Sequence, residues 1–252
     1  MSDVTVARDG HVAVVELHRP PHNFFDQGLV SEIADAMEEL DGDVGCRVVV
    51  LAAEGRSFCA GADFSGGTRS SNVDGGSLYH EALRLFAVSI PIVAAVHGPA
   101  IGGGLGLALV ADFRVTCPEA RFSANFTQLG FHPGFALTAT LPELVGRQVA
   151  RDLFFTGRRV PGDEAVRVGL ADECVEQAAV RERAVARAGG IAASAPLAVR
   201  AVKATLNEGR LARLREATDR ELAEQSRLLA TDDAKEGIKA SIERRPPTFS
   251  GA

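Results

Sequence analysis

The 252-residue chain has 33 acidic and 27 basic side chains, which give a net charge of −6, and 46% of its residues are hydrophobic. A chain of this length buries a sizeable core, either as one large domain or as a domain with an appendage. The acidic balance excludes the basic footprint of a protein that binds nucleic acid or anionic lipid, so we expect neither partner. Any anionic ligand must therefore be held by local groups.

The four cysteines (Cys46, Cys59, Cys117 and Cys174) are scattered, without a CxxC pair or metal-like spacing. We therefore expect reduced thiols, no bound metal and a cytoplasmic location. The N-terminus lacks the apolar region of a signal peptide. Residues 90–111 carry no formal charge and are long enough to span a bilayer, but prolines and glycines interrupt them. We favour a strand followed by a buried helix, and expect no membrane partner.

The first two thirds of the chain alternate between strand and helix patterns, which favours an α/β fold. Residues 4–17 alternate about Asp9-Gly10 and predict a β-hairpin. Asp26 precedes apolar residues at helical spacing and predicts a capped helix, and the apolar run at 46–53 predicts a strand buried on both faces. Further patterns predict a mobile or lid-like loop at 65–77, a helix at 78–88, a strand at 91–98, a helix starting in the glycine run, and a strand at 113–117.

From about Pro142 onward the pattern is almost wholly helical. The predicted helical segments lie at 143–155, 162–170, 178–207 and 213–229. No low-complexity linker separates this part from the first. We therefore expect the helices to close or extend one domain and to offer surfaces to other subunits.

Two segments, 48–64 and 91–113, each run from a buried strand into a turn of small residues. Such turns leave backbone N–H groups uncovered, and the second opens a helix whose positive end favours an anion. Side by side, two such turns donate one N–H each to a single oxygen, as in an oxyanion hole. The alternative is that the glycines only permit close packing. A dinucleotide-binding loop is excluded because the third required glycine falls at Leu107.

Four motifs in order carry a resemblance to a known family: SFCAGADF, HGPAIGGGLGLALVADFRV, FFTGRRVPGDEAVRVGLADECV and EGIKASIERRPPTF. With them the chain resembles the enoyl-CoA hydratase/isomerase family, the crotonase superfamily, over nearly its whole length. The resemblance implies a crotonase-like spiral of ββα repeats at 1–195 and a C-terminal helical trimerisation region at 196–252. It also implies a homotrimer or a dimer of trimers, an acyl-CoA substrate of fatty acid metabolism, and no cofactor beyond that coenzyme A.

The resemblance assigns roles to individual residues. The thioester enolate is stabilised by the backbone N–H groups of Ala62 and Gly103, because donors fixed in place bind the charge that develops in the transition state. Each arginine given to coenzyme A is, taken alone, better explained as a solvated surface charge. The residues assigned to coenzyme A binding are Arg56, Phe58, Ala60, Ala62 and Arg244.

The resemblance also identifies three positions where family members carry carboxylates. The two glutamates of the hydratases correspond to Gly106 and Phe126, and the carboxylate of some isomerases and dehalogenases corresponds to Gly134. We place these three residues in the acyl pocket, where Phe126 favours an alkyl or aryl chain over a bound water. We predict a lyase or isomerase that is a poor hydratase and performs isomerisation, decarboxylation, C–C cleavage or thioester hydrolysis. The alternative is a non-catalytic acyl-CoA carrier or sensor.

Other side chains are candidates to replace the missing carboxylates. His132 lies in a turn near the expected thioester and is able to act as a base near pH 7, or else to hydrogen bond the loop backbone. Tyr79, His80 and Glu81 begin a helix, and at most one of them reaches the pocket because consecutive helical residues face different ways. We interpret Asp63 as a structural hydrogen-bond acceptor.

Overall fold

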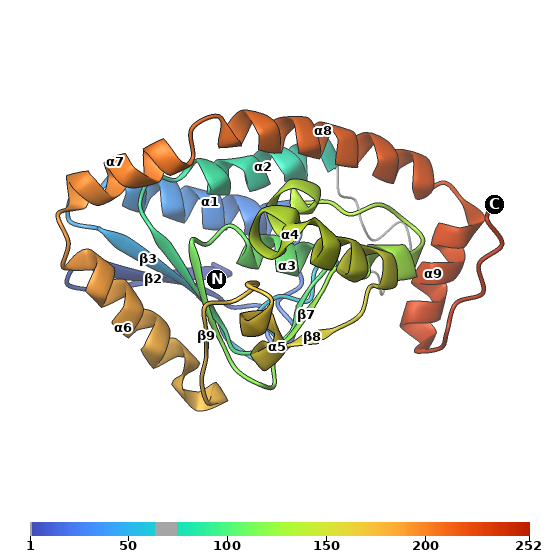
Figure 1. The fold of residues 1–252 in the computed structure, drawn as a ribbon, viewed down its shortest axis with the longest axis horizontal. Helices are drawn as coiled ribbons and strands as arrows, with labels where there is room; N and C mark the ends of the chain where they lie inside the picture. The colour runs from blue at the N-terminus through green and yellow to red at the C-terminus, as the bar shows by residue number, and fades with distance from the viewer. Residues whose placement is uncertain (1, 64–74) are drawn as a thin grey trace.

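The computed structural model describes residues 2–63 and 75–252, and these form strands wound into a spiral with helices outside (Figure 1). Most of the loop expected at 65–77 lies outside the described residues. Its last three residues belong instead to helix α2 (Gly75–Ala87), which begins earlier than the sequence predicted.

The larger sheet has six strands in the order β1-β2-β3-β4-β6-β9. The hairpin predicted about Asp9-Gly10 is confirmed, and every later strand joins in parallel. All of β4 is buried, and β3 is buried up to its last residue, because helices cover both faces of a parallel sheet. The strands are β1 (Val4–Asp9), β2 (Val12–Leu17), β3 (Val48–Ala53), β4 (Ile92–Val96), β6 (Phe113–Thr116) and β9 (Glu173–Cys174).

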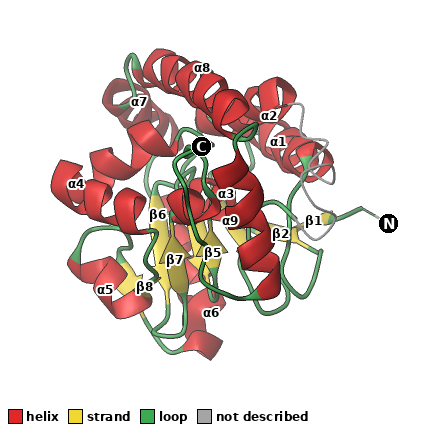
Figure 2. Cartoon of the chain, turned by 90° about the vertical axis from the view of Figure 1, so that its right-hand side faces the viewer, coloured by secondary structure: helices red, strands yellow, loops and turns green. Residues whose placement is uncertain are grey.

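A second sheet contains three short strands in the order β5-β7-β8 (Figure 2). They are β5 (Ala100–Ile101), β7 (Arg121–Ser123) and β8 (Val160–Pro161). Successive turns of the chain therefore supply one strand to each sheet, which confirms the predicted spiral of ββα repeats. The sequence did not reveal these strands, because two or three residues are too few to show an alternating pattern.

Helices cover both faces of the larger sheet (Figure 1). Helix α1 (Gln27–Gly42) packs on β1, β2 and α2, and α6 (Val180–Ala192) packs across β2, β3, β4 and β6. The predicted cap of α1 is confirmed, since the Asp26 carboxylate accepts a hydrogen bond from the N–H of Leu29 at 2.9 Å. The short helix α3 (Gly103–Ala108) begins in the glycine run, as predicted.

The last part of the chain is helical, although its boundaries differ from those predicted. The predicted segment 178–207 is broken, because Pro196 ends the hydrogen-bond ladder and starts a new helix. A short 3₁₀ helix, η1 (Asn125–Leu129), precedes α4. The remaining helices are α4 (Leu137–Thr156), α5 (Gly162–Arg167), α7 (Pro196–Leu206), α8 (Arg210–Leu228) and α9 (Asp232–Glu243).

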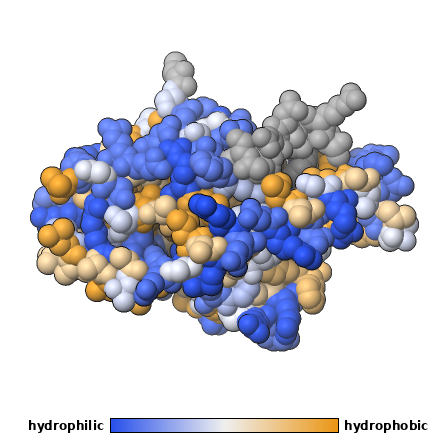
Figure 3. All heavy atoms as spheres, turned by 90° about the horizontal axis from the view of Figure 1, so that it is seen from above, coloured by the Kyte–Doolittle hydropathy of each residue, from blue (hydrophilic) through white to orange (hydrophobic). Residues whose placement is uncertain are grey.

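Helices α7 and α8 lie along one side of the molecule, where hydrophilic residues predominate and hydrophobic residues lie among them (Figures 1 and 3). Three apolar side chains of α7, those of Leu197, Val202 and Leu206, are exposed. In the described part of the chain, no helix has both the length and the apolar character needed to cross a membrane. The uncharged stretch at 90–111 forms β4, β5 and α3, which confirms the favoured interpretation.

Candidate active site

The two turns of small residues lie side by side, as the oxyanion-hole interpretation requires. The Cys59 N–H donates to the Pro99 carbonyl at 3.1 Å, and the Ile101 N–H donates to the Cys59 carbonyl at 3.0 Å. A Cβ atom on Gly104 would overlap the Cys59 carbonyl, so only glycine fits at this close approach. This pairing fixes both turns in position relative to each other.

The backbone N–H groups of Ala62 and Gly103 belong to these turns, and both residues line a cavity. A Cβ atom on Gly61 would lie 3.6 Å from the Gly103 nitrogen, which shows how closely the turns approach. Gly103 is the first residue of α3, so its N–H has no carbonyl partner within the helix. Neither N–H donates to another described residue. Two unused donors on a cavity wall have the arrangement of an oxyanion hole.

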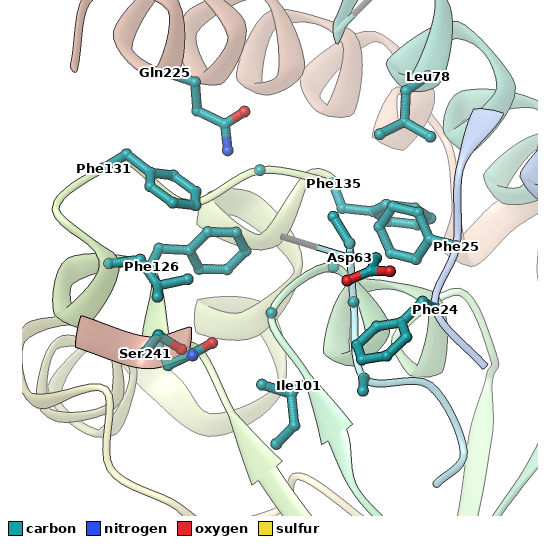
Figure 4. Close-up of a pocket in the computed structure, with 18 of the residues that line it drawn as sticks. Phe24, Phe25, Asp63, Leu78, Ile101, Phe126, Phe131, Phe135, Gln225 and Ser241 are labelled. Carbon is teal, nitrogen blue, oxygen red and sulfur yellow. The ribbon is translucent and has the colours of Figure 1, made fainter. Parts of the chain in front are cut away.

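The cavity has a volume of about 620 Å³ and is lined by the two turns together with residues of α2, η1, α8 and α9. Its walls are aromatic (Figure 4). The Phe126 and Phe131 rings meet edge to face with centroids 5.8 Å apart, and those of Phe25 and Phe135 are tilted at 5.7 Å. Such walls favour an apolar chain, because burying apolar surface is the main source of affinity in a pocket of this kind.

The three residues assigned to the acyl pocket occupy different places. Phe126 and Gly134 line the cavity, whereas Gly106 does not. A Cβ atom on Gly106 would lie 2.6 Å from the Cβ atom of Phe135 and 2.7 Å from its ring. The Phe135 side chain therefore occupies the space into which a longer residue at position 106 would extend.

Of the three side chains at the start of α2, only Tyr79 lines the cavity. The His80 side chain is 75% exposed, and Glu81 pairs with Arg84 at 2.5 Å. The Tyr79 hydroxyl donates to Oε1 of Gln225, on α8, at 2.7 Å. The prediction that at most one of the three side chains reaches the cavity is confirmed, although the sequence did not indicate that it is Tyr79.

His132 does not line the cavity in the described part of the chain. Its Nδ1 lies 2.8 Å from the Pro133 carbonyl oxygen, which matches the loop-backbone contact considered as its alternative role. The role of His132 as a base remains a prediction.

A buried carboxylate that the sequence did not single out lies behind the cavity wall. Glu221 on α8 accepts hydrogen bonds from the Ala136 N–H at 2.8 Å, the Thr138 N–H at 2.8 Å and the Thr138 hydroxyl at 2.6 Å. The donors belong to Ala136 and Thr138, at the end of a turn in which Phe135 and Ala136 have positive φ angles of 63° and 58°. Burial raises the pKa of Glu221 to about 7 despite the three donors.

The residues assigned to coenzyme A are divided between the cavity and its surroundings. Ala60, Ala62 and Arg244 line the cavity, whereas the exposed Arg56 and the fully buried Phe58 do not. Exposed Arg159, next to β8, lines it as well. The coenzyme A roles remain predictions.

Sequence reasoning missed several residues of the cavity wall. The Asp63 carboxylate, interpreted as a structural acceptor, lies on the wall between the aromatic groups (Figure 4). Phe24 and Phe25 come from the loop before α1, and Gln225 comes from α8. No sequence signal links these segments, because each is brought to the cavity by the spiral rather than by local spacing.

Comparisons with known proteins agree with this fold. The family model described as enoyl-CoA hydratase/isomerase matches residues 7–252. The chain is 33% identical to the short-chain-enoyl-CoA hydratase of Clostridium acetobutylicum, covering 97% of this chain and 96% of that one. It is also 33% identical to the crotonyl-CoA hydratase of Syntrophomonas wolfei, covering 98% and 97%.

Solved structures share the fold along the full length of the chain. The crystal structure of an enoyl-CoA hydratase/isomerase from Pseudoalteromonas atlantica superposes with a TM-score of 0.89 at 30% identity, covering 99% of this chain and 100% of that one. The protein is thus an enzyme with the crotonase fold. The chain belongs to the enoyl-CoA hydratase/isomerase family.

Proposed function

We propose that the protein binds an acyl-CoA thioester and stabilises its enolate between the N–H groups of Ala62 and Gly103, while being a poor hydratase. The observation that carries the proposal is the pair of unused N–H donors on an aromatic cavity. A thioester oxygen gains negative charge when the neighbouring carbons react, and fixed donors bind that charge more strongly than the neutral carbonyl. Coenzyme A enters only as part of the substrate, and no further cofactor is proposed.

The weak hydration follows from the residues at the three positions where the resemblance expects carboxylates. Phe126 presents a ring to the cavity, Gly134 has no side chain, and Phe135 fills the space beside Gly106. Among the described residues that line the cavity, Asp63 is the one carboxylate. A pair of carboxylates that holds and activates a water is therefore not part of the proposal. Isomerisation, decarboxylation, C–C cleavage and thioester hydrolysis remain the candidate reactions.

The first experiment measures hydration of crotonyl-CoA by loss of the conjugated enoyl absorbance, with a two-glutamate hydratase as the reference. We expect a rate about 10²- to 10⁴-fold below the reference, which is the usual contribution of a positioned acid or base. A rate equal to the reference would contradict the proposal. His132→Asn and Asp63→Asn would then identify the group that activates water.

The second experiment incubates the protein with acyl-CoA thioesters that represent the candidate reactions and follows their masses. Conversion of one thioester supports an enzyme of enolate chemistry. Thermal stabilisation by thioesters that all remain intact would instead support a carrier or sensor, because a ligand that binds the folded state raises its stability whether or not it reacts.

We also propose that coenzyme A itself is required for binding, with Arg159 and Arg244 as cations for its phosphates. Both arginines are exposed, and both line the cavity. Calorimetry with butyryl-CoA and butyrate tests this proposal. Equal affinities would contradict it.

We propose a homotrimer or a dimer of trimers, with residues 196–252 at the subunit contacts. The exposed Leu197, Val202 and Leu206 of α7 support this arrangement, because apolar side chains gathered on one helix are typical of an interface. Light scattering at micromolar concentration tests it, and a stable monomer would contradict it. A cytoplasmic location is proposed from the four cysteines, all of which are free thiols.

A further inference from the structure

One polar part of the cavity wall is formed by side chains from two helices. Gln225 extends from α8 toward the space between Phe131 and Phe135 (Figure 4). Tyr79, from α2, donates its hydroxyl hydrogen to Gln225 Oε1 at 2.7 Å, and Gln225 Nε2 donates to the His132 carbonyl at 2.8 Å. Because both ends of the amide are hydrogen bonded, its orientation is determined and its donor and acceptor atoms are known.

The pair keeps one N–H donor and acceptor lone pairs that no described residue uses, including one on Gln225 Oε1. The amide group of Gln225 has two N–H bonds, and the second has no partner among the described residues. The Tyr79 oxygen has two lone pairs, and the backbone N–H of Phe135 uses one of them. Both side chains line the cavity. An alcohol, which donates one hydrogen bond and accepts another, is the complementary group.

The position of the Tyr79 hydroxyl depends on the missing side chain of Gly134. A Cβ atom on Gly134 would overlap the hydroxyl oxygen and would lie 2.7 Å from Gln225 Nε2. The hydroxyl thus occupies the place that any side chain at position 134 would need. Glycine is the residue that allows a polar group from α2 to reach the cavity here.

This pair binds a ligand group without exchanging protons with it. Burial and the nearby charge of Glu221 raise the pKa of Tyr79, and the opposing effect of the Phe135 backbone is smaller. The phenol therefore stays neutral at physiological pH, and an amide does not titrate. The role that remains is recognition: a hydroxyl group at this part of the wall gains two hydrogen bonds, whereas an alkyl chain leaves the donor and the acceptor unpaired.

We propose that Tyr79 and Gln225 determine specificity by selecting acyl-CoA thioesters whose acyl chain carries a hydroxyl group. The proposal rests on the proposed function, since it assumes that the cavity holds the acyl chain. It goes further by naming the substituent that the substrate carries and the two residues that recognise it.

Calorimetric titration of the full-length protein with valeryl-CoA and with its 2-, 3-, 4- and 5-hydroxy derivatives tests the proposal. We expect at least one hydroxy isomer to bind about tenfold more tightly than valeryl-CoA, as one or two neutral hydrogen bonds allow. Tyr79→Phe and Gln225→Met each remove one partner while keeping the shape of the side chain. Each should reduce the preference to about twofold or less.

Two further variants separate recognition from general damage to the cavity. Gly134→Ala should also remove the preference, because its methyl group displaces the Tyr79 hydroxyl. Glu216→Gln, an exposed position of α8 that does not line the cavity, should leave it unchanged. Thermal unfolding establishes that each variant folds, and Gln225→Met decides the test if Tyr79→Phe does not fold.

Equal affinity of the wild-type protein for all five thioesters would overturn this inference alone. A preference that survives in both Tyr79→Phe and Gln225→Met would overturn it as well, because recognition would then lie elsewhere. If none of the five thioesters binds, the proposed function fails, and the inference fails with it.

Discussion

Replacing Glu221 with glutamine should remove one titration from the pH dependence of stability. The pKa of this carboxyl is about 7 in the folded protein, against 4.5 for an ordinary glutamate. The folded state therefore holds a proton that the unfolded chain releases between these values. The stabilisation from this proton is complete below pH 4.5 and is lost as the pH rises through 7. The full difference corresponds to about 3 kcal/mol, of which roughly 2–3 kcal/mol falls between pH 5 and 8.

The assay is denaturant unfolding of the wild type and Glu221→Gln at equal protein concentration from pH 5 to pH 8. Between pH 5 and pH 8, the free energy of unfolding of the wild type should fall by roughly 2–3 kcal/mol relative to that of Glu221→Gln. All other titrations cancel in this comparison. Glu216→Gln, an exposed change on the same helix, is the control and should leave the difference constant. Parallel curves for wild type and Glu221→Gln would refute the reasoning, since they would mean that Glu221 titrates normally.

Four further changes test the packing around the site, two helices and a buried arginine. Gly106→Glu should destabilise the fold by about 1–3 kcal/mol without creating hydratase activity, because the new side chain meets Phe135. Gly189→Ala has open space around the new methyl group and should stabilise the protein by about 0.5–1 kcal/mol. Thermal unfolding measures the stability of both variants, and loss of the enoyl absorbance measures the hydratase activity of Gly106→Glu. A Gly106→Glu protein as stable as the wild type would contradict the packing argument. Asp26→Ala should cost about 1 kcal/mol through the lost cap of α1, seen as a lower denaturation midpoint. Arg114→Ala should cost about 3 kcal/mol, because three backbone carbonyls lose a buried donor; an unchanged midpoint would show that water replaces the guanidinium.

The sequence predicted every strand of the larger sheet except the two-residue β9, and no strand of the smaller sheet. The β-branched run of β3 and the hairpin at Asp9-Gly10 have periodicities that local physics determines. Strand β8, with two residues, exists only because β7 lies beside it. Pro196 is a sequence signal for a helix break, but the apolar spacing continues on both sides of it. The sequence pattern therefore predicted one helical segment where the structure has two.

The parts of the site that are made of backbone N–H groups could be predicted from the sequence. The parts where side chains from distant segments meet could not. The small residues around Ala62 and Gly103 indicate exposed N–H groups, and the structure places both on the cavity. By contrast, Tyr79 and Gln225 are separated by 146 positions, and nothing in either neighbourhood indicates their contact. The displacement of position 106 from the cavity depends on Phe135, whose positive φ is imposed by the turn that Glu221 holds.

The order of the strands has a consequence for how the chain folds during synthesis. In the larger sheet the spatial order β1-β2-β3-β4-β6-β9 follows the order of the chain, so the sheet grows at one edge only. Each newly synthesised repeat can pair with the strand that was made before it, and no strand has to insert between two earlier ones. Until β9 arrives, the advancing edge carries unpaired backbone groups and apolar side chains. A chain that stops between β4 and β6 therefore exposes a β-branched edge strand, the kind of edge that pairs with other chains.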